Sequence, residues 1–128
     1  MRLLLDTHTF LWWVNDGPPV SRRARSAIGD AANECFLSLA SSWEIAVKVS
    51  LGKVKLPSAP ERFIPEQLRA NAFRELPIEI GHVGRVARMP FHQRDPFDRL
   101  LAAQALEESL TIVSADTIFR RYGIKRVW

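Results

Sequence analysis

Apolar residues along this chain fall into two kinds of segment, which are short uninterrupted runs and longer stretches with helical spacing. The run Leu3–Leu5 is too short for a helix, and its consecutive apolar positions predict a strand that is covered on both faces. A second strand is expected over Glu34–Leu39 and another buried strand over Thr111–Val113. Two further extended pieces are expected. Leu76–Ile78 contains a proline and therefore suits the edge of a sheet, and Ile124–Val127 follows a glycine near the end of the chain.

Helical spacing of apolar residues, with capping residues before it, fills the segments between the strands. Ser21 is a suitable N-cap, and Asp95 followed by Pro96 marks the start of the most regular helix. The expected helices are Thr7–Val14, Arg22–Asp30, Glu44–Leu51, Glu61–Phe73, Ile80–Arg88, Pro96–Glu108 and a short one through Ile118 and Phe119. Because parallel strands need crossover connections, this order predicts an α/β fold with three α/β/α layers and a mostly parallel sheet, in one domain over residues 1–128.

Composition narrows the class of protein. The chain has 128 residues and 47% hydrophobic content, which supports one core, and its formal charge of +4 favours an anionic partner without identifying it. The single cysteine, Cys35, lies in an apolar patch, so we expect it in the core of a protein from a reducing compartment. Asp6 ends the N-terminal apolar run too soon for a signal peptide, and no later run could span a bilayer. A cytoplasmic location is therefore expected.

Acidic residues follow the predicted strands at the sheet edge where ligands bind in open α/β folds. Asp6 ends the first strand, Glu44 begins the helix after the second, Asp98 lies in the first turn of the long late helix, and Asp116 follows the Thr111–Val113 strand. Each acid also has a structural explanation. Asp6 and Asp116 suit N-caps, and two spacings resemble capping boxes: Ser41-x-x-Glu44 and Asp95-x-x-Asp98.

Taken together, the four acids favour a metal site. Carboxylates gathered in a partly desolvated crevice raise one another's pKa unless a cation neutralises them. An oxygen-only donor set favours Mg²⁺ or Mn²⁺ over zinc, and the three histidines form no pair at helical spacing. We expect His8, beside Asp6, to pack or to form a hydrogen bond.

Four motifs, in order over essentially the whole chain, resemble the PIN-domain ribonucleases, and most closely the VapC-like toxins of bacterial type II toxin-antitoxin pairs. The motifs are Asp6-Thr7-His8-x-x-Leu11-Trp12, Ser42-x-x-Ile45-x-x-Lys48, Arg94-Asp95-Pro96-Phe97-Asp98-Arg99-Leu100-Leu101-Ala102-Ala103-Gln104-Ala105 and Ser114-Ala115-Asp116. The chain departs from the family in two places: many members have serine where His8 stands and a basic residue near Ala115. These departures concern the choice of substrate.

The resemblance implies hydrolysis of RNA phosphodiester bonds that depends on Mg²⁺ or Mn²⁺, a cognate antitoxin partner and a homodimer. It carries over Asp6, Glu44, Asp98 and Asp116 as the catalytic acids. Of these, Asp6, Asp98 and Asp116 are the expected metal ligands, and Glu44 either binds the metal or orients the attacking water. The additional candidates are Asp95, Ser114 and Lys48, of which Lys48 either contacts phosphate or pairs with Glu44.

Two other functions remain open at this stage. A haloacid-dehalogenase-like phosphatase also begins with a strand that ends in aspartate, but it needs a second aspartate two residues later, where His8 stands. A catalytically silent PIN module would be a binding scaffold, but such a module is expected to lose acids. This chain keeps all four, so neither alternative is favoured.

Overall fold

The sheet at the centre of the molecule has five strands, all parallel, in the order β3-β2-β1-β4-β5. The computed structural model describes residues 1–128, the whole printed chain. Its strands are β1 (Arg2–Leu5), β2 (Glu34–Ser38), β3 (Arg74–Leu76), β4 (Thr111–Val113) and β5 (Arg126–Val127). The predicted parallel sheet is confirmed.

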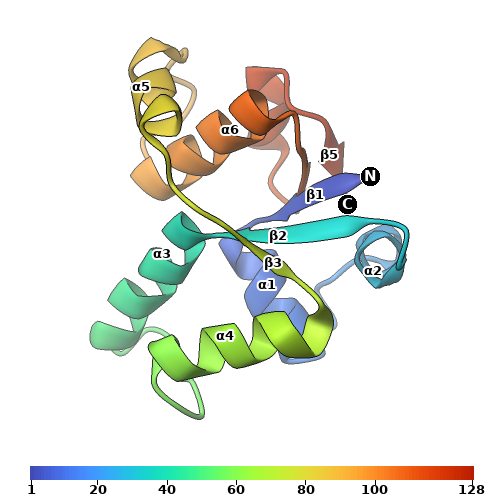
Figure 1. Ribbon diagram of the computed structural model, residues 1–128. Coiled ribbons are helices and arrows are strands. Elements are labelled where there is room, and N and C mark those ends of the chain that lie inside the picture. Colours follow the sequence, from blue (N-terminus) through green and yellow to red (C-terminus); the bar gives the residue numbers. More distant parts are fainter.

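Helices cover both faces of this sheet, so the predicted three layers are also confirmed (Figure 1). In Figure 1, α5 and α6 lie on one side of the strands, and α1 and α4 lie on the other. No helix is both long and apolar enough to cross a membrane. The helices are α1 (Thr7–Val14), α2 (Arg22–Gly29), α3 (Leu39–Ser50), α4 (Pro60–Asn71), α5 (Ile80–Arg88), α6 (Pro96–Glu108) and the 3₁₀ helix η1 (Thr117–Tyr122).

The apolar run of β1 divides its side chains between two core clusters. Leu4 packs in the cluster that contains Leu101 of α6, whereas Leu3 and Leu5 pack in the cluster that contains Phe10 of α1. All three leucines are fully buried, and burial of each stabilises the fold by about 1.5–3 kcal/mol. A strand buried on both faces needs apolar residues at consecutive positions, which explains the unbroken run in the sequence.

The register of the central strands places their polar successors side by side. Leu5 pairs with Leu37 of β2 and with Val113 of β4, so these strands end at the same level. Asp6 and Ser114, the next residues of β1 and β4, therefore lie at one edge. The strand order reverses between β1 and β4, and such a switch point is where open α/β sheets form a ligand crevice.

The start of α3 differs from the prediction. The helix begins at Leu39, five residues before Glu44, and the Ser38 hydroxyl caps it by accepting a hydrogen bond from the Ala40 amide at 3.0 Å. The predicted capping box between Ser41 and Glu44 is therefore wrong. The strand passes directly into the helix with no glycine or proline between them, so the apolar pattern does not reveal the boundary.

Two strands are displaced or shortened relative to the prediction. β3 covers Arg74–Leu76 rather than Leu76–Ile78, because Pro77 has no amide hydrogen for a further ladder bond. It lies at the sheet edge, as expected from that proline. β5 covers Arg126–Val127 rather than Ile124–Val127, because the first predicted residue still hydrogen-bonds to η1.

Cys35 is part of the core, as predicted. It lies on β2 and is buried, and this burial raises the pKa of its thiol to about 11, although the positive N-terminus acts in the opposite direction. The thiol is therefore protonated at neutral pH and lacks the thiolate character that reactive cysteines need.

Candidate active site

Asp6 is a buried carboxylate between two hydrogen-bond donors at the switch point of the sheet. One of its oxygens accepts a hydrogen bond from the Thr9 amide at 2.7 Å and so caps α1. The other accepts a short hydrogen bond from the hydroxyl of Ser114. The expected capping role of Asp6 is confirmed. Each carboxylate oxygen accepts one hydrogen bond and keeps a further lone pair that could bind a cation.

Ser114 links the two strand-end acids. It is fully buried, and its hydroxyl donates to Asp6 while accepting a hydrogen bond from the Asp116 amide at 3.0 Å. Asp116 caps η1 by accepting a hydrogen bond from the Ile118 amide at 2.9 Å. The side chain of Ser114 thus orients Asp6 and fixes the backbone that carries Asp116.

Glu44 lies inside α3, where its buried carboxylate has a partner for each oxygen. Thr7 donates its hydroxyl to one oxygen at 2.7 Å, and the ammonium group of Lys48 lies 2.7 Å from the other. Lys48 therefore pairs with Glu44, which was one of its two predicted roles. Buried carboxylates are tolerated when they are paired and hydrogen-bonded in this way.

Asp98 lies in the first turn of α6, which Asp95 caps through the amides of Phe97 and Asp98 at 2.9 and 3.4 Å. The Asp98 side chain itself makes no hydrogen bond and no ion pair. It is half-buried. Among the predicted acids it is therefore the one that has lost water without gaining a protein partner.

The surroundings of Asp98 raise the pKa of its carboxyl group from 3.8 to about 7. Burial is the largest cause, and the negative charges of Asp95, Glu44, Asp6 and Asp116 follow in that order. All four of the acids predicted from the sequence therefore meet electrostatically at one place, and Asp95 joins them. A nearby cation would reverse this shift by favouring the charged carboxylate.

A hard divalent cation suits these oxygen donors. No three of the predicted carboxylates place oxygen atoms within 4.8 Å of one another, so a bound cation would have to draw side chains together. Asp98 can turn without breaking a hydrogen bond, whereas Asp6 and Glu44 are held by their donors. A carboxylate without a hydrogen-bond partner, close to carboxylates that have them, is compatible with Mg²⁺ or Mn²⁺, which take carboxylate oxygens and water as ligands.

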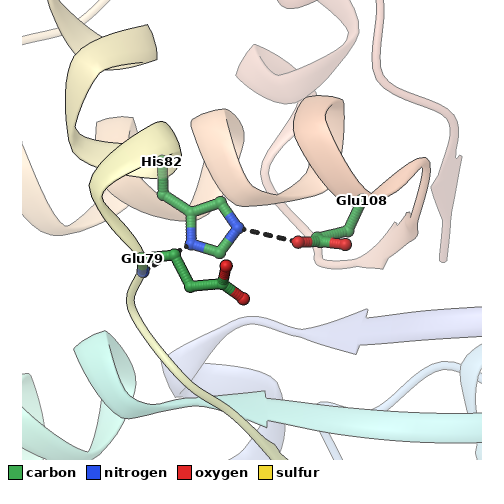
Figure 2. Close-up of side chains that lie close together, drawn as sticks. All are labelled: Glu79, His82 and Glu108. Atoms are coloured by element: carbon green, nitrogen blue, oxygen red, sulfur yellow. Dashed lines mark hydrogen bonds and ion pairs between the residues drawn. The ribbon is translucent and has the colours of Figure 1, made fainter.

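A different group of side chains does bring its potential ligand atoms within 4.8 Å, and it consists of Glu79, His82 and Glu108 (Figure 2). The ring of His82 is nearly fully buried between α5 and α6. Its Nδ1 accepts a hydrogen bond from the Glu79 amide at 3.0 Å, and its Nε2 lies 3.0 Å from a carboxylate oxygen of Glu108. With Nδ1 an acceptor, Nε2 carries the hydrogen and donates it to Glu108. Neither nitrogen offers a free lone pair, so the group ties α5 to α6.

Several contacts of the site were not predicted from the sequence. The role of Thr7 as a donor to Glu44 was missed, although the residue lies in a quoted motif, and so was the role of Arg126, which donates to the Ser114 carbonyl at 2.8 Å. His8 is exposed and forms no hydrogen bond, but it packs against Trp12 with 5.8 Å between ring centroids.

Comparison with known proteins adds one curated relative. Ribonuclease VapC16 of Mycobacterium tuberculosis (strain ATCC 25618 / H37Rv) is 33% identical over 58 residues, which is 45% of this chain and 41% of the relative. The match therefore spans less than half the length of that protein.

Solved structures share the whole fold at low sequence identity. The structure of VapBC2 from Rickettsia felis, bound to a DNA fragment from its promoter, matches with a TM-score of 0.73 and 16% identity, covering 98% of this chain and 97% of that one. DNA-bound VapBC from Salmonella typhimurium gives 0.68 and 18%, covering 98% and 96%, and FitAcB from Neisseria gonorrhoeae gives 0.64 and 21%, covering 97% and 95%. The family model of the PIN domain matches residues 3–125, and the chain therefore belongs to the PIN domain family.

Proposed function

We propose that this chain is a ribonuclease that depends on Mg²⁺ or Mn²⁺ and that cleaves RNA phosphodiester bonds with water. The carrying observation is the unpaired Asp98 carboxylate, whose pKa is raised by burial and by four neighbouring acids. Membership of the PIN family and the similarity to a protein named as a ribonuclease support the same conclusion. A phosphatase of the haloacid-dehalogenase type would need a second aspartate at position 8, where this chain has histidine.

In this proposal Asp6, Asp98 and Asp116 hold the cation, directly or through water. When bound, the cation would polarise the phosphate and lower the pKa of a water molecule that attacks it. Ser114 keeps the Asp6 carboxylate in place, and Glu44 either joins the ligands or orients the water. The ammonium group of Lys48, 2.7 Å from a carboxylate oxygen of Glu44, holds that side chain at the edge of the cluster. Asp95 contributes negative charge and the start of α6.

The first prediction tests this assignment by RNA cleavage. Wild type should cleave RNA with Mg²⁺ or Mn²⁺ and lose activity in chelator, because no side chain at the site is a nucleophile without activated water. Asp98→Asn should lower the cleavage rate at least about a hundredfold, or roughly 2.7 kcal/mol of transition-state stabilisation. Glu108→Gln is the matched control, since it lies outside the proposed site and retains an oxygen acceptor for His82. Full cleavage in chelator, or an Asp98→Asn protein as active as Glu108→Gln, would contradict the assignment. A protein that binds RNA but never cleaves it would be the silent scaffold.

We also propose that the chain is the toxin of a toxin-antitoxin pair, acts as a homodimer and is inhibited by a small antitoxin. Support comes from the names of its similar structures, which are VapBC and FitAB assemblies. Expression of wild type alone should slow growth, and Asp6→Asn should not. Equal growth with the two chains would overturn the toxin role. The mass of the purified protein in solution would test the dimer separately.

A further inference from the structure

Three arginines come together at the β5 side of the candidate active site without a carboxylate partner. Arg126 lies on β5, Arg23 on α2 and Arg120 on η1, and both α2 and η1 pack against β5. None of the three makes an ion pair. We refer to Arg23, Arg120 and Arg126 as the arginine cluster. In contrast, five other arginines are paired with acids: Arg25, Arg62, Arg74, Arg85 and Arg88.

Arg126 connects this cluster to the acids. Its Nη1 donates to the Ser114 carbonyl at 2.8 Å, and the hydroxyl of the same serine donates to Asp6. This is the only hydrogen bond that the guanidinium makes, and its buried Nε has no acceptor. Most of the donor capacity of a group with five N–H bonds therefore remains unused.

The charges of the cluster repel one another. Burial lowers the pKa of the Arg126 guanidinium, the positive charges of Arg120 and Arg23 lower it further, and only the carboxylate of Asp116 acts in the opposite direction. A positive group held near two like charges, with unused donors, is stabilised by an anion. Guanidinium groups bind phosphate particularly well because their planar donors match its oxygens.

We propose that the arginine cluster binds the phosphates of RNA nucleotides that flank the cleaved bond. This inference rests on the proposed ribonuclease function. Arg126 is fixed by Ser114 at the end of β4, so a strand held there lies beside Asp6 and Asp116, where the scissile phosphate would sit. The exposed side chains of Arg23 and Arg120 add positive charge close to Arg126, whereas the acids by themselves repel RNA.

The test measures RNA binding without cleavage. A fluorescein-labelled oligouridylate of about 12 nucleotides is titrated with full-length protein in chelator, and its anisotropy is followed at several salt concentrations. Arg23→Gln and Arg120→Gln should each weaken binding, and each should reduce the slope of log K against log salt by about 0.7, the value for one phosphate contact of a single strand. Arg69→Gln is the matched control, because Arg69 is an exposed arginine of α4 that makes no ion pair and is not among the charges that act on Arg126.

The outcomes separate this inference from the proposed function. Because Arg126 also donates to the Ser114 carbonyl, RNA binding by Arg126→Gln is interpreted only if the melting temperature of this variant matches that of wild type. The variants of the two exposed arginines, Arg23 and Arg120, are sufficient for the test. If wild type cleaves and binds RNA but Arg23→Gln and Arg120→Gln bind it as Arg69→Gln does, the cluster is not an RNA site. If those variants instead lose binding to an oligoglutamate peptide of equal charge, the site serves an acidic protein and the proposal is overturned. Absence of RNA cleavage by wild type would defeat the proposed function itself.

Discussion

Asp98 is the residue at which the free-energy cost of gathering five acids is concentrated. Burial and, after it, the neighbouring acids raise the pKa of its carboxyl group from 3.8 to about 7, while Asp6 and Glu44 are each held by hydrogen-bond donors. Between these two pKa values the folded chain binds more protons at Asp98 than the unfolded chain does. The free energy of unfolding therefore decreases as the pH rises from about 4 to about 7.

The second prediction follows from this decrease in the free energy of unfolding with rising pH. In chelator at pH 8, where the penalty is fully present, Asp98→Asn should melt at a higher temperature than wild type, and the difference should vanish towards pH 4. Loss of an acid from a first helical turn opposes this gain by about 0.3–1 kcal/mol. Glu61→Gln measures that opposing effect alone, because Glu61 is the exposed first-turn acid of α4 and is not among the acids that act on Asp98. An Asp98→Asn protein that melts below wild type by as much as Glu61→Gln would make Asp98 an ordinary helix-start residue.

The third prediction concerns the pair formed by Glu44 and Lys48. Lys48→Met should lower the free energy of unfolding by about 1–3 kcal/mol, because it leaves a nearly buried carboxylate without its cation. Glu44→Gln should remove most of that penalty when combined with Lys48→Met. Urea denaturation of both single variants and the double variant gives the coupling energy. A coupling energy near zero would mean that Lys48 does not pair with Glu44 in solution and is available for phosphate.

At the scale of the elements, the connection from α5 to α6 is fastened by Arg99. This buried residue of α6 donates to the carbonyls of Val86 and Pro90 at 3.0 and 3.1 Å, and its guanidinium lies 4.4 Å from the centre of the Phe91 ring. The same connection carries Asp95, which caps the helix on which Asp98 lies. Arg99 thereby links the end of α5 to the acid cluster.

The fourth prediction tests that link. Arg99→Met should lower the free energy of unfolding by about 2–3 kcal/mol, because two carbonyls lose a charged donor. It should also speed proteolysis within residues 89–95. Arg94→Met is the control: Arg94 is exposed in the same connection and makes no ion pair, so its loss should change stability by less than about 0.5 kcal/mol. Equal effects of the two substitutions would show that Arg99 does not fasten the connection.

The elements also show what the sequence could and could not predict. Leu3–Leu5 was recognisable because a strand buried on both faces has a distinctive pattern, and Asp95 with Pro96 marks the start of α6 through local chemistry. The start of α3 could not be recognised in the sequence, because the apolar pattern passes from strand to helix without a turn residue. The contact of Arg126 with Ser114 depends on the register in which β5 pairs with β4 after the intervening helix η1, and no local pattern encodes that register.

At the scale of the whole molecule, acidic and basic side chains form two separate groups that lie next to each other. A chain with a net charge of +4 gathers two acids that follow its central strands with three acids of α3 and the start of α6, and it places three unpaired arginines beside them at β5. Under the proposed function, this arrangement would place a cation and an anionic polymer next to each other, as metal-dependent cleavage of RNA requires. The central claim is that the acids, and no other group in the chain, hold the cation.

Titration with Mn²⁺, followed by its electron paramagnetic resonance signal, tests that claim most directly. Wild type, Asp98→Asn, Asp6→Asn and Glu108→Gln are compared under the same conditions, the last because it alters the alternative group around His82. We predict that Asp98→Asn and Asp6→Asn each weaken Mn²⁺ binding at least about tenfold, or roughly 1.4 kcal/mol, and that Glu108→Gln binds as wild type does. Binding that survives both aspartate substitutions, or that is lost in Glu108→Gln, would contradict the account.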